Sequence, residues 1–354
     1  MKELVEKIAA EIKIRGIISF AQFMRMALYC PNYGFYETET DTVGRKGSFY
    51  TSVSVGKLFG QLLAVQFSEW LGQAEPLDEG VAGTGKVQLA EAGAHNGALA
   101  KDILDWLRMH RAGIFERVEY CILEPSARRR SRQAFALQEF GNRVRWSADW
   151  DDFQRDGVRG VIFSNELLDA MPMHRVSWDA KQGEWFEWGV ALRGETFEWA
   201  RMEKGGKTQR RREEDAETRR KQKAQFQAHE EKDFDYEDEI SLKRTWLHQL
   251  PAALLEILPD GFTTEVCPEA LRWWKSAARA LRWGRLMTID YGFTIEELLA
   301  PERKEGTLRG YRNHRLITDV LTHPGKEDLT AHVNFAAVEE AGITAGLTTE
   351  LFTS

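Results

Sequence analysis

Between residues 87 and 290 the sequence repeatedly places a short apolar run before a helix-like segment. Three of these runs end on an acid, namely Glu91, Glu124 and Asp290. The runs are VQLAE, EYCILE, VRWSADW, RGVIFSNE and GRLMTIDYG. Such alternation predicts an α/β fold with a mainly parallel sheet and helices on both faces. In sheets of this kind the ligand binds outside the carboxyl ends of the strands, so the polar residues at these ends indicate one binding crevice.

The first of these units, QLAEAGAHNGALAKDIL over residues 88–104, has the pattern of a strand, a tight loop and a helix. Leu99, Ile103 and Leu107 recur every four residues, as on one face of a helix. Gly93 and Gly97 bracket the loop, and no other glycine lies between them. A dinucleotide pyrophosphate needs the closer glycine spacing G-x-G-x-x-G. The loop therefore disfavours a nicotinamide-dependent oxidoreductase.

S-adenosylmethionine suits this loop better, because it has no phosphate and carries a cationic sulfonium and an ammonium group. An acid at Glu91 suits that charge. Glu124, 33 residues further on, is placed to accept hydrogen bonds from two ribose hydroxyls. Asp149, after the run VRWSA, is a candidate for the adenine edge. Each acid alone fits better as a solvated strand-end or helix N-cap residue, but the ordered set favours a cofactor site.

The segments around this region have other patterns. Residues 1–83 are mostly helical in pattern, beginning with a helix that has Leu4, Ile8 and Ile12 on one face. A second helix is predicted in VGKLFGQLLAVQFSEWLGQ, and residues 74–86 form a Gly-rich linker. The apolar residues of this second helix that have helical spacing are Leu58, Phe59, Leu62, Leu63 and Phe67. The alternating GEWFEWGVALRGETFEWARM predicts a hairpin that turns at Gly194.

A charged insertion follows this hairpin. Residues 201–223 carry ten basic and five acidic side chains, and residues 230–239 carry seven acids and one lysine. With almost no apolar residues, this segment is expected to form a solvated helix or a mobile insertion. An arm that binds a partner or nucleic acid is the less favoured alternative.

Composition excludes several classes of protein. The net charge of −7 argues against a general nucleic-acid binder. No apolar run approaches the roughly 18 residues of a membrane-spanning helix, and the N-terminus lacks the pattern of a targeting peptide. The three distant cysteines fit neither a disulfide framework nor a metal site, so we expect a reducing compartment and a cytoplasmic location. They are Cys30, Cys121 and Cys267.

Several segments resemble the MidA-like methyltransferase family, and together they span nearly the whole chain. CPNYGFYETETDTVGRKGSFYTSVS is similar to the family's N-terminal Pro-x-x-Gly-Tyr-Tyr and Gly-Asp-Phe-x-Thr-Ser segments. EAGAHNGALAKDIL stands where the family has its glycine-rich cofactor loop. The later similar segments are CILEPSARRRSRQ, FSNELLDAMPMHRV, TIDYGF and GTLRGYRNHRLITDVLTHPGKEDLTAHVNF. SNELLDAMP together with DLTAHVNF is the most specific part.

The resemblance implies a class I methyltransferase fold, which is Rossmann-like, and S-adenosylmethionine as cofactor. It implies that Asn165, Glu166 and Asp169 face the cofactor and the substrate. The implied cofactor-binding residues are Glu91, Gly93, Gly97, Glu124 and Asp149. No metal is expected, since His314, His323 and His332 have a spacing that suits no usual ligand motif.

The mitochondrial branch of the family methylates an arginine on a subunit of respiratory complex I during assembly. The resemblance therefore implies a protein substrate with an arginine acceptor, whose identity the sequence does not name. Because a guanidinium is cationic, it needs carboxylates that hold it and orient one nitrogen. Glu166 is the first candidate for this role, with Asp169 and Asp290 in support.

We expect a methyltransferase core over residues 84–180 and 260–354, with residues 1–83 and the 181–259 hairpin and charged insertion forming a substrate-facing subdomain. Candidates for a substrate lid are Tyr33, Phe35, Phe49 and Tyr50. Membrane insertion and specific nucleic-acid binding are not expected, and a homodimer is one possible assembly. The alternative function is an S-adenosylmethionine-binding assembly or interaction factor without turnover. The altered loop at His95 and a C-terminus short of the family's usual segment motivate that alternative.

Overall fold

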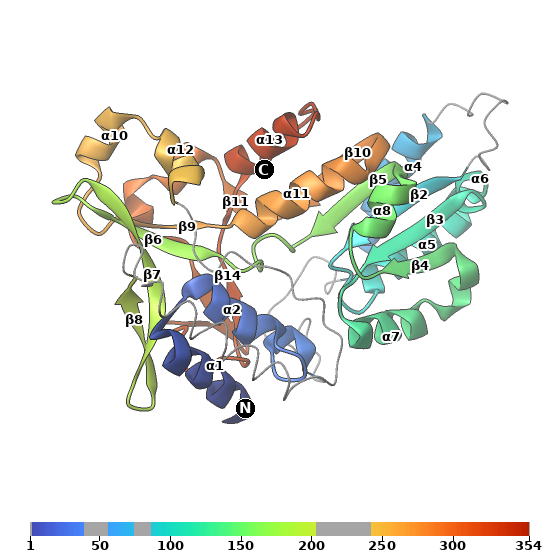
Figure 1. Ribbon diagram of the computed structural model, residues 1–354. Coiled ribbons are helices and arrows are strands. Elements are labelled where there is room, and N and C mark those ends of the chain that lie inside the picture. The colour runs from blue at the N-terminus through green and yellow to red at the C-terminus, as the bar shows by residue number, and fades with distance from the viewer. Residues whose placement is uncertain (1, 39–55, 74–85, 203–241, 354) are drawn as a thin grey trace.

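The computed structural model describes residues 2–38, 56–73, 86–202 and 242–353. Its elements form two main sheets. Figure 1 shows the parallel sheet on the right and an antiparallel sheet on the left, with α11 (Pro268–Ala280) running between them. The chain leaves the parallel sheet after its fourth strand in sequence and returns to it much later.

The parallel sheet has the strand order β10-β5-β2-β3-β4, and every neighbouring pair is parallel. This confirms the predicted mainly parallel sheet. In register, Leu123 pairs with both Ala92 and Ser147, so the carboxyl ends of these strands lie at one edge. The strands are β2 (Val87–Ala92), β3 (Val118–Leu123), β4 (Val144–Ser147), β5 (Val158–Asn165) and β10 (Leu281–Ile289).

Helices cover both faces of this sheet, as predicted. On one face α4 (Leu58–Gly72) and α5 (Ala98–His110) bury Phe67 and Ile103 against the strands. On the other face α8 (Asp151–Asp156) and α11 bury Phe153 and Ala277. α6 (Ala112–Phe115), α7 (Ala127–Ala136) and the 3-10 helix η2 (Gln138–Arg143) complete the connections.

Helix α4 differs from its predicted pattern. Leu63 and Phe67 are buried as expected, but Leu58 and Leu62 are 67% and 59% exposed. The helix is apolar around most of its circumference, so its spacing alone does not select the buried face. Contact with α5 at the small residue Gly60 sets the actual orientation, since a Cβ there would lie 2.7 Å from Cβ of Asp102.

The second sheet is antiparallel, in the order β1-β7-β6-β9 with β8 paired to β7. The predicted hairpin is confirmed, because Arg193 pairs with Thr196 across a turn at Gly194, which has φ of 63°. These strands are β1 (Ile17–Ser19), β6 (His174–Asp179), β7 (Glu184–Arg193), β8 (Thr196–Arg201) and β9 (Thr263–Val266).

The N-terminal segment packs on this second sheet. The predicted first helix is confirmed as α1 (Lys2–Arg15), with Leu4, Ile8 and Ile12 buried. It is followed by α2 (Phe20–Tyr29) and the 3-10 helix η1 (Phe35–Glu37). A small sheet of β12 (Arg309–Arg312), β13 (Arg315–Ile317) and β14 (Asp328–Thr330) joins the same core through Leu329.

Short elements complete the chain between these sheets. The helices are η3 (Leu242–Arg244), η4 (Trp246–Gln249), α10 (Ala252–Ile257), α12 (Ile295–Leu298), η5 (Pro301–Arg303) and α13 (Phe335–Thr344). A parallel pair is formed by β11 (Gly292–Phe293) and β15 (Val333–Asn334).

Some elements pack in a different part of the structure from the one that the predicted domain boundaries give them. α4 packs in the methyltransferase-like core, although its sequence belongs to the predicted 1–83 region. β6 and β9 lie in the antiparallel sheet, although residues 84–180 and 260–354 were predicted as core. The charged segment at 203–241, nearly all of the 74–86 linker, and Phe49 and Tyr50 lie outside the described residues.

Close approach of backbones marks the centre of the parallel sheet. Gly160 in β5 has φ of 151°, and a Cβ there would lie 2.1 Å from the carbonyl oxygen of Gln88 in β2. A side chain at this position would force the two strands apart. Glycine is therefore required for the packing of β5 on β2.

Candidate functional site

The loop between β2 and α5 has left-handed backbone at both predicted glycines. Gly93 has φ of 77° and Gly97 has φ of 82°, conformations that residues with a Cβ adopt only at a cost. A Cβ at Gly93 would lie 3.0 Å from Cδ1 of Leu167. The loop therefore packs directly on the segment that follows β5.

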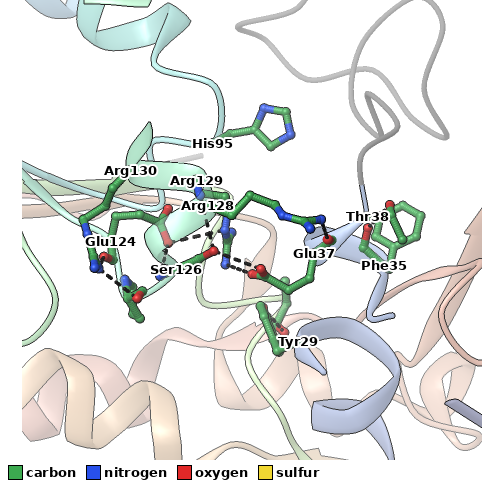
Figure 2. Close-up of polar contacts among 12 residues, drawn as sticks. Tyr29, Phe35, Glu37, Thr38, His95, Glu124, Ser126, Arg128, Arg129 and Arg130 are labelled. Carbon is green, nitrogen blue, oxygen red and sulfur yellow. Dashed lines mark hydrogen bonds and ion pairs between the residues drawn. The ribbon is translucent and has the colours of Figure 1, made fainter. Parts of the chain in front are cut away.

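His95, the residue between these glycines that the sequence left unassigned, also has left-handed backbone, with φ of 46°. Its carbonyl oxygen accepts a hydrogen bond from Nε2 of Gln133 at 3.0 Å. Figure 2 shows its ring directed away from the carboxylate of Glu124. The main chain of His95 thus joins the loop to α7.

Glu124 follows β3 directly and is 1% exposed. Its Oε1 accepts the N–H of Ser126 at 3.0 Å, and its Oε2 accepts Nε2 of Gln133 at 3.1 Å. Nε of Arg129 lies 3.3 Å from the same Oε1. Burial raises the pKa of Glu124, and the charge of Arg129 opposes that rise. Because each carboxylate oxygen has two acceptor directions, this fixed group retains capacity for further donors.

Glu91 has a protein partner in the core. Strand alternation places it on the same face as Leu89, which α4 and α5 cover. Its Oε2 accepts the hydroxyl of Tyr120 at 2.6 Å, and the residue is 3% exposed. Burial raises the pKa of Glu91 to about 7, and the hydrogen bond from Tyr120 opposes the rise. Direct contact of Glu91 with a cofactor therefore stays a prediction.

Asp149 lies two residues beyond β4. Its Oδ1 accepts the N–H of Asp151 at 3.0 Å, at the start of α8. This Asx-type turn is the ordinary role of an aspartate before a helix, which is the alternative that the sequence left open. A contact with the adenine edge stays a prediction.

The segment after β5 carries the predicted substrate residues. The Oδ1 of Asn165 is buried and has no hydrogen-bond partner among the residues that the structure describes. Glu166 has left-handed backbone with φ of 48°, and its N–H donates to the carbonyl of Ile289 at 2.8 Å. The chain then turns toward β6 without forming a helix. The alternative role of Glu166 as a helix N-cap is therefore wrong.

Asp290 lies just beyond β10 and holds this turn in place. Its Oδ2 accepts the N–H groups of Leu167 at 3.1 Å and Leu168 at 2.8 Å. Its Oδ1 accepts the N–H of Tyr291 at 2.9 Å. Burial raises the pKa of Asp290 to about 6, and the backbone donors oppose the rise.

Asp169 and Asp328 are two further carboxyl groups at this site, and both are buried. They are 7% and 2% exposed. Burial raises the pKa of Asp169 well above its ordinary range, and the charges of Asp290 and Asp328 raise it further. Burial raises the pKa of Asp328 to about 7, against a hydrogen bond of 2.5 Å that the hydroxyl of Tyr36 donates to Oδ1. Burial and neighbouring acids thus disfavour the ionised forms of these groups, and a cation bound beside them would favour ionisation.

The structure thus brings Glu166, Asp169 and Asp290 together, as predicted, and adds Asp328. Asp328 is the first residue of the similar segment DLTAHVNF, but a single Asp at the start of a short strand gives no pattern from which a role could be predicted. Tyr29 lies close to Asp169, because its hydroxyl donates to the carbonyl of Ala170 at 2.9 Å. Burial raises its pKa, and the charges of Arg129, Asp169 and Asp328 all act on it.

The predicted lid residues that the structure describes lie in the N-terminal core. Phe35 is 3% exposed and Tyr33 packs against the same cluster. Packing therefore accounts for both aromatic side chains.

Two of the histidines have local partners in the structure. His174 lies 2.6 Å from Oε1 of Glu187 through its Nδ1 in the second sheet. The ring of His332 packs against that of Phe293 in a tilted arrangement, and burial lowers the pKa of His332 to about 4. Within the described parts of the chain, no group of three or more His, Cys, Asp or Glu side chains could hold a metal ion. None of the described helices has the length and apolar character needed to cross a membrane.

Comparison with known families gives a match over most of the chain. Residues 62–353 match the family described as "Putative S-adenosyl-L-methionine-dependent methyltransferase". The chain is 27% identical to the zebrafish protein named "Protein arginine methyltransferase NDUFAF7, mitochondrial", over 95% of this chain and 71% of that one. It is 25% identical to the homologue of that protein in Drosophila melanogaster, over 97% and 70% of the two chains.

A solved structure gives the same result for the fold. A COG1565 superfamily member from Burkholderia thailandensis, crystallised with S-adenosyl-homocysteine, superimposes with a TM-score of 0.73 at 28% identity. The match covers 98% of this chain and 76% of that one. Together with the parallel sheet, this similarity confirms the predicted class I methyltransferase fold.

Proposed function

The chain belongs to the family of S-adenosyl-L-methionine-dependent methyltransferases, and from this premise we propose that it methylates an arginine side chain of a partner protein. The names of the relatives in zebrafish and Drosophila support an arginine acceptor. The observation that carries the proposal is the group of carboxyl groups formed by Asp169, Asp290 and Asp328, of which Asp169 and Asp328 are buried.

The residues at the carboxyl ends of β2, β3 and β5 fit S-adenosylmethionine. When bound, this cofactor supplies an electrophilic methyl group on a sulfonium. Glu124 would accept the ribose hydroxyls, and the left-handed loop at Gly93 and Gly97 lets the backbone approach closely. The buried and unpartnered Oδ1 of Asn165 would accept a donor from the cofactor or the substrate.

The carboxyl groups would bind the acceptor. A guanidinium stays charged under all ordinary conditions and offers five N–H donors. Its charge would favour ionisation of Asp169 and Asp328, whose pKa values burial raises. Glu166, with Asp169 beside it, would hold the guanidinium and direct one nitrogen toward the methyl group. Positioning is the main contribution of such a site, since methyl transfer is an in-line displacement.

Two substitutions separate cofactor binding from transfer. Glu124→Gln should weaken S-adenosylmethionine binding by about tenfold or more, because a charged acceptor of two hydroxyls is lost. Glu166→Gln should leave that binding within twofold of the unmodified protein but reduce arginine methylation. Calorimetry measures the first effect. Mass spectrometry of arginine methylation in a lysate, with and without the protein, measures the second.

Either of two results would contradict the proposal. One is absence of S-adenosylmethionine binding by the unmodified protein. The other is methylation confined to residues other than arginine. Binding without any methyl transfer would instead favour the assembly factor without turnover.

We also propose a cytoplasmic location, which the three distant cysteines support. Fractionation with an antibody against the native chain would test it. A homodimer stays a proposal as well, and sedimentation velocity at micromolar concentration distinguishes it from a monomer.

A further inference from the structure

Arg129 joins two carboxylates that come from distant parts of the chain. Its Nη2 lies 3.1 Å from Oε1 of Glu37 in η1, and its Nε lies 3.3 Å from Oε1 of Glu124. All three side chains are largely buried, at 17% exposed for Arg129, 12% for Glu37 and 2% for Glu124. Figure 2 shows the arginine lying between the two acids. This bridge is therefore shielded from solvent and salt.

The arginines on either side of Arg129 have different partners. Arg128 donates from Nη1 to the carbonyl of Glu37 and from Nη2 to Oδ1 of Asn32, both at 2.9 Å. Arg130 donates from Nη1 to the carbonyl of Glu124 at 2.7 Å. Of these three consecutive residues, the middle one alone contacts the Glu124 carboxylate in the described structure.

Other contacts hold η1 and the start of α7 together. The hydroxyl of Ser126 donates to Oε2 of Glu37 at 2.9 Å. Because the N–H of Ser126 also donates to Glu124, one residue contacts both acids. The N-terminal segment thus docks where the candidate ribose acceptor is fixed.

The charges around Glu124 explain what the bridge does for it. Burial raises the pKa of Glu124, and the charge of Glu37 from η1 raises it further, while the charge of Arg129 from α7 and the hydrogen bonds from Ser126 and Gln133 lower it. Tyr29 and Tyr36 face Arg129 from α2 and η1. An ionised carboxyl group is an acceptor at both oxygens, whereas protonation makes one of them a donor and removes the charge that strengthens these hydrogen bonds. Arg129 favours that state.

We propose that Arg129 is a positioning residue for cofactor binding: it fixes the ionised carboxylate of Glu124 and ties it to Glu37, so that docking of the N-terminal segment and binding of the cofactor ribose stabilise each other. This inference rests on the proposed function, because it concerns the same cofactor site. Linkage makes the coupling reciprocal. The N-terminal segment thereby contributes to cofactor affinity through a residue that the cofactor need not touch.

Calorimetry with S-adenosylmethionine on the full chain tests the role of Arg129. Arg129→Met should raise the Kd about tenfold at pH 7, because Glu124 loses the opposite charge that lies 3.3 Å from its Oε1. Without Arg129 the pKa of Glu124 should rise, so the variant carries more protonated Glu124 at pH 6 than at pH 8. The loss of affinity relative to the unmodified protein should therefore be larger at pH 6. Arg130→Met is the matched control, because among the described residues Arg130 contacts only the carbonyl oxygens of Glu124 and Pro125, and its Kd should stay within twofold. Equal losses in both variants, or no loss in Arg129→Met, would overturn the inference.

Two further variants test the bridge itself. Glu37→Gln should change the Kd at least twofold when Arg129 is present and by a clearly smaller factor in the Arg129→Met background, where Glu37 acts on Glu124 only through its charge and through Ser126. The same factor in both backgrounds would overturn the link to Glu37. Arg129→Lys keeps the charge but not the planar fork that spans two acids. Arg129→Lys should bind S-adenosylmethionine with a Kd between those of the unmodified protein and Arg129→Met. It replaces Arg129→Met in the test if that variant is too unstable to assay.

Failure of the inference about Arg129 can be distinguished from failure of the proposed function. If the unmodified protein does not bind S-adenosylmethionine, both proposals are overturned. If it binds but the arginine contrast is absent, only the inference about Arg129 is overturned.

Discussion

Replacing Glu91 by Gln tests the effect of a carboxyl group buried inside the parallel sheet. Burial raises the pKa of Glu91 in the folded protein to about 7, from an ordinary value of 4.5. The folded protein therefore binds more protons than the unfolded chain between these two pH values. Since the folded pKa is the higher one, the free energy of unfolding falls as pH rises from about 4.5 to about 7.

The magnitude follows from that difference. At about 1.4 kcal/mol for each pH unit, ionised Glu91 costs about 3 kcal/mol of stability above pH 7. Glutamine has nearly the same shape, stays neutral and can still accept the hydroxyl of Tyr120. We therefore expect Glu91→Gln to be more stable than the unmodified protein by about 3 kcal/mol at pH 8. At pH 5 the gain should be below about 1 kcal/mol.

Urea unfolding followed by tryptophan fluorescence, at pH 5 and pH 8, measures this difference. Comparing the two proteins at each pH cancels the titration of other buried groups such as Asp328. Glu119→Gln is a suitable control on the neighbouring strand, because Glu119 pairs with Arg145 at 2.9 Å and should give no gain at pH 8. A stability change of equal size at both pH values would refute the reasoning.

Three other substitutions follow from the structure. Gly97→Ala should destabilise the protein by about 1 kcal/mol, because φ is 82° there, and should weaken S-adenosylmethionine binding in calorimetry. Gly160→Ala should cost more than about 3 kcal/mol in thermal unfolding, since its Cβ would lie 2.1 Å from the carbonyl oxygen of Gln88. Asp328→Asn should slow arginine methylation about tenfold, with cofactor Kd within twofold of the unmodified value.

Each has a control or a contradicting outcome. Gly194→Ala has the same left-handed penalty in an open turn, at φ of 63°, and should keep full cofactor affinity. Unchanged affinity in Gly97→Ala would show that the loop path does not matter for binding. A normal melting temperature in Gly160→Ala, or a normal transfer rate in Asp328→Asn, would contradict the packing and substrate-binding arguments.

The parallel sheet could be predicted because each of its strands carries a complete local signal. An apolar run, a polar end and a periodic helix lie within about 30 residues of one another in the first units, as at Val87 to Leu107. α1 was equally clear, since three buried residues recur at one spacing. Local patterns of this kind survive because tertiary contacts reinforce them.

The features that the sequence did not predict depend on tertiary contacts, which a local pattern does not contain. Leu58 and Leu62 are exposed because α4 is apolar on several faces and contact with α5 decides which one is buried. The hydrogen bond between Tyr120 and Glu91 depends on the neighbouring strand, so the local pattern does not contain it, and a cofactor contact of Glu91 stays a prediction. The bridge from Glu37 to Arg129 joins segments far apart in the sequence, and neither residue has a distinctive pattern by itself.

The pairing of β10 with β5 has a consequence for synthesis of the chain. β5 ends at Asn165, and its edge partner begins only at Leu281. At about 5–20 residues per second, a ribosome takes on the order of ten seconds to make the intervening segment. During that interval the apolar edge of β5 has no native strand beside it, and an unpaired edge readily adds a foreign strand. The nascent chain should therefore depend most on chaperones after the fourth strand has emerged and before the fifth is complete.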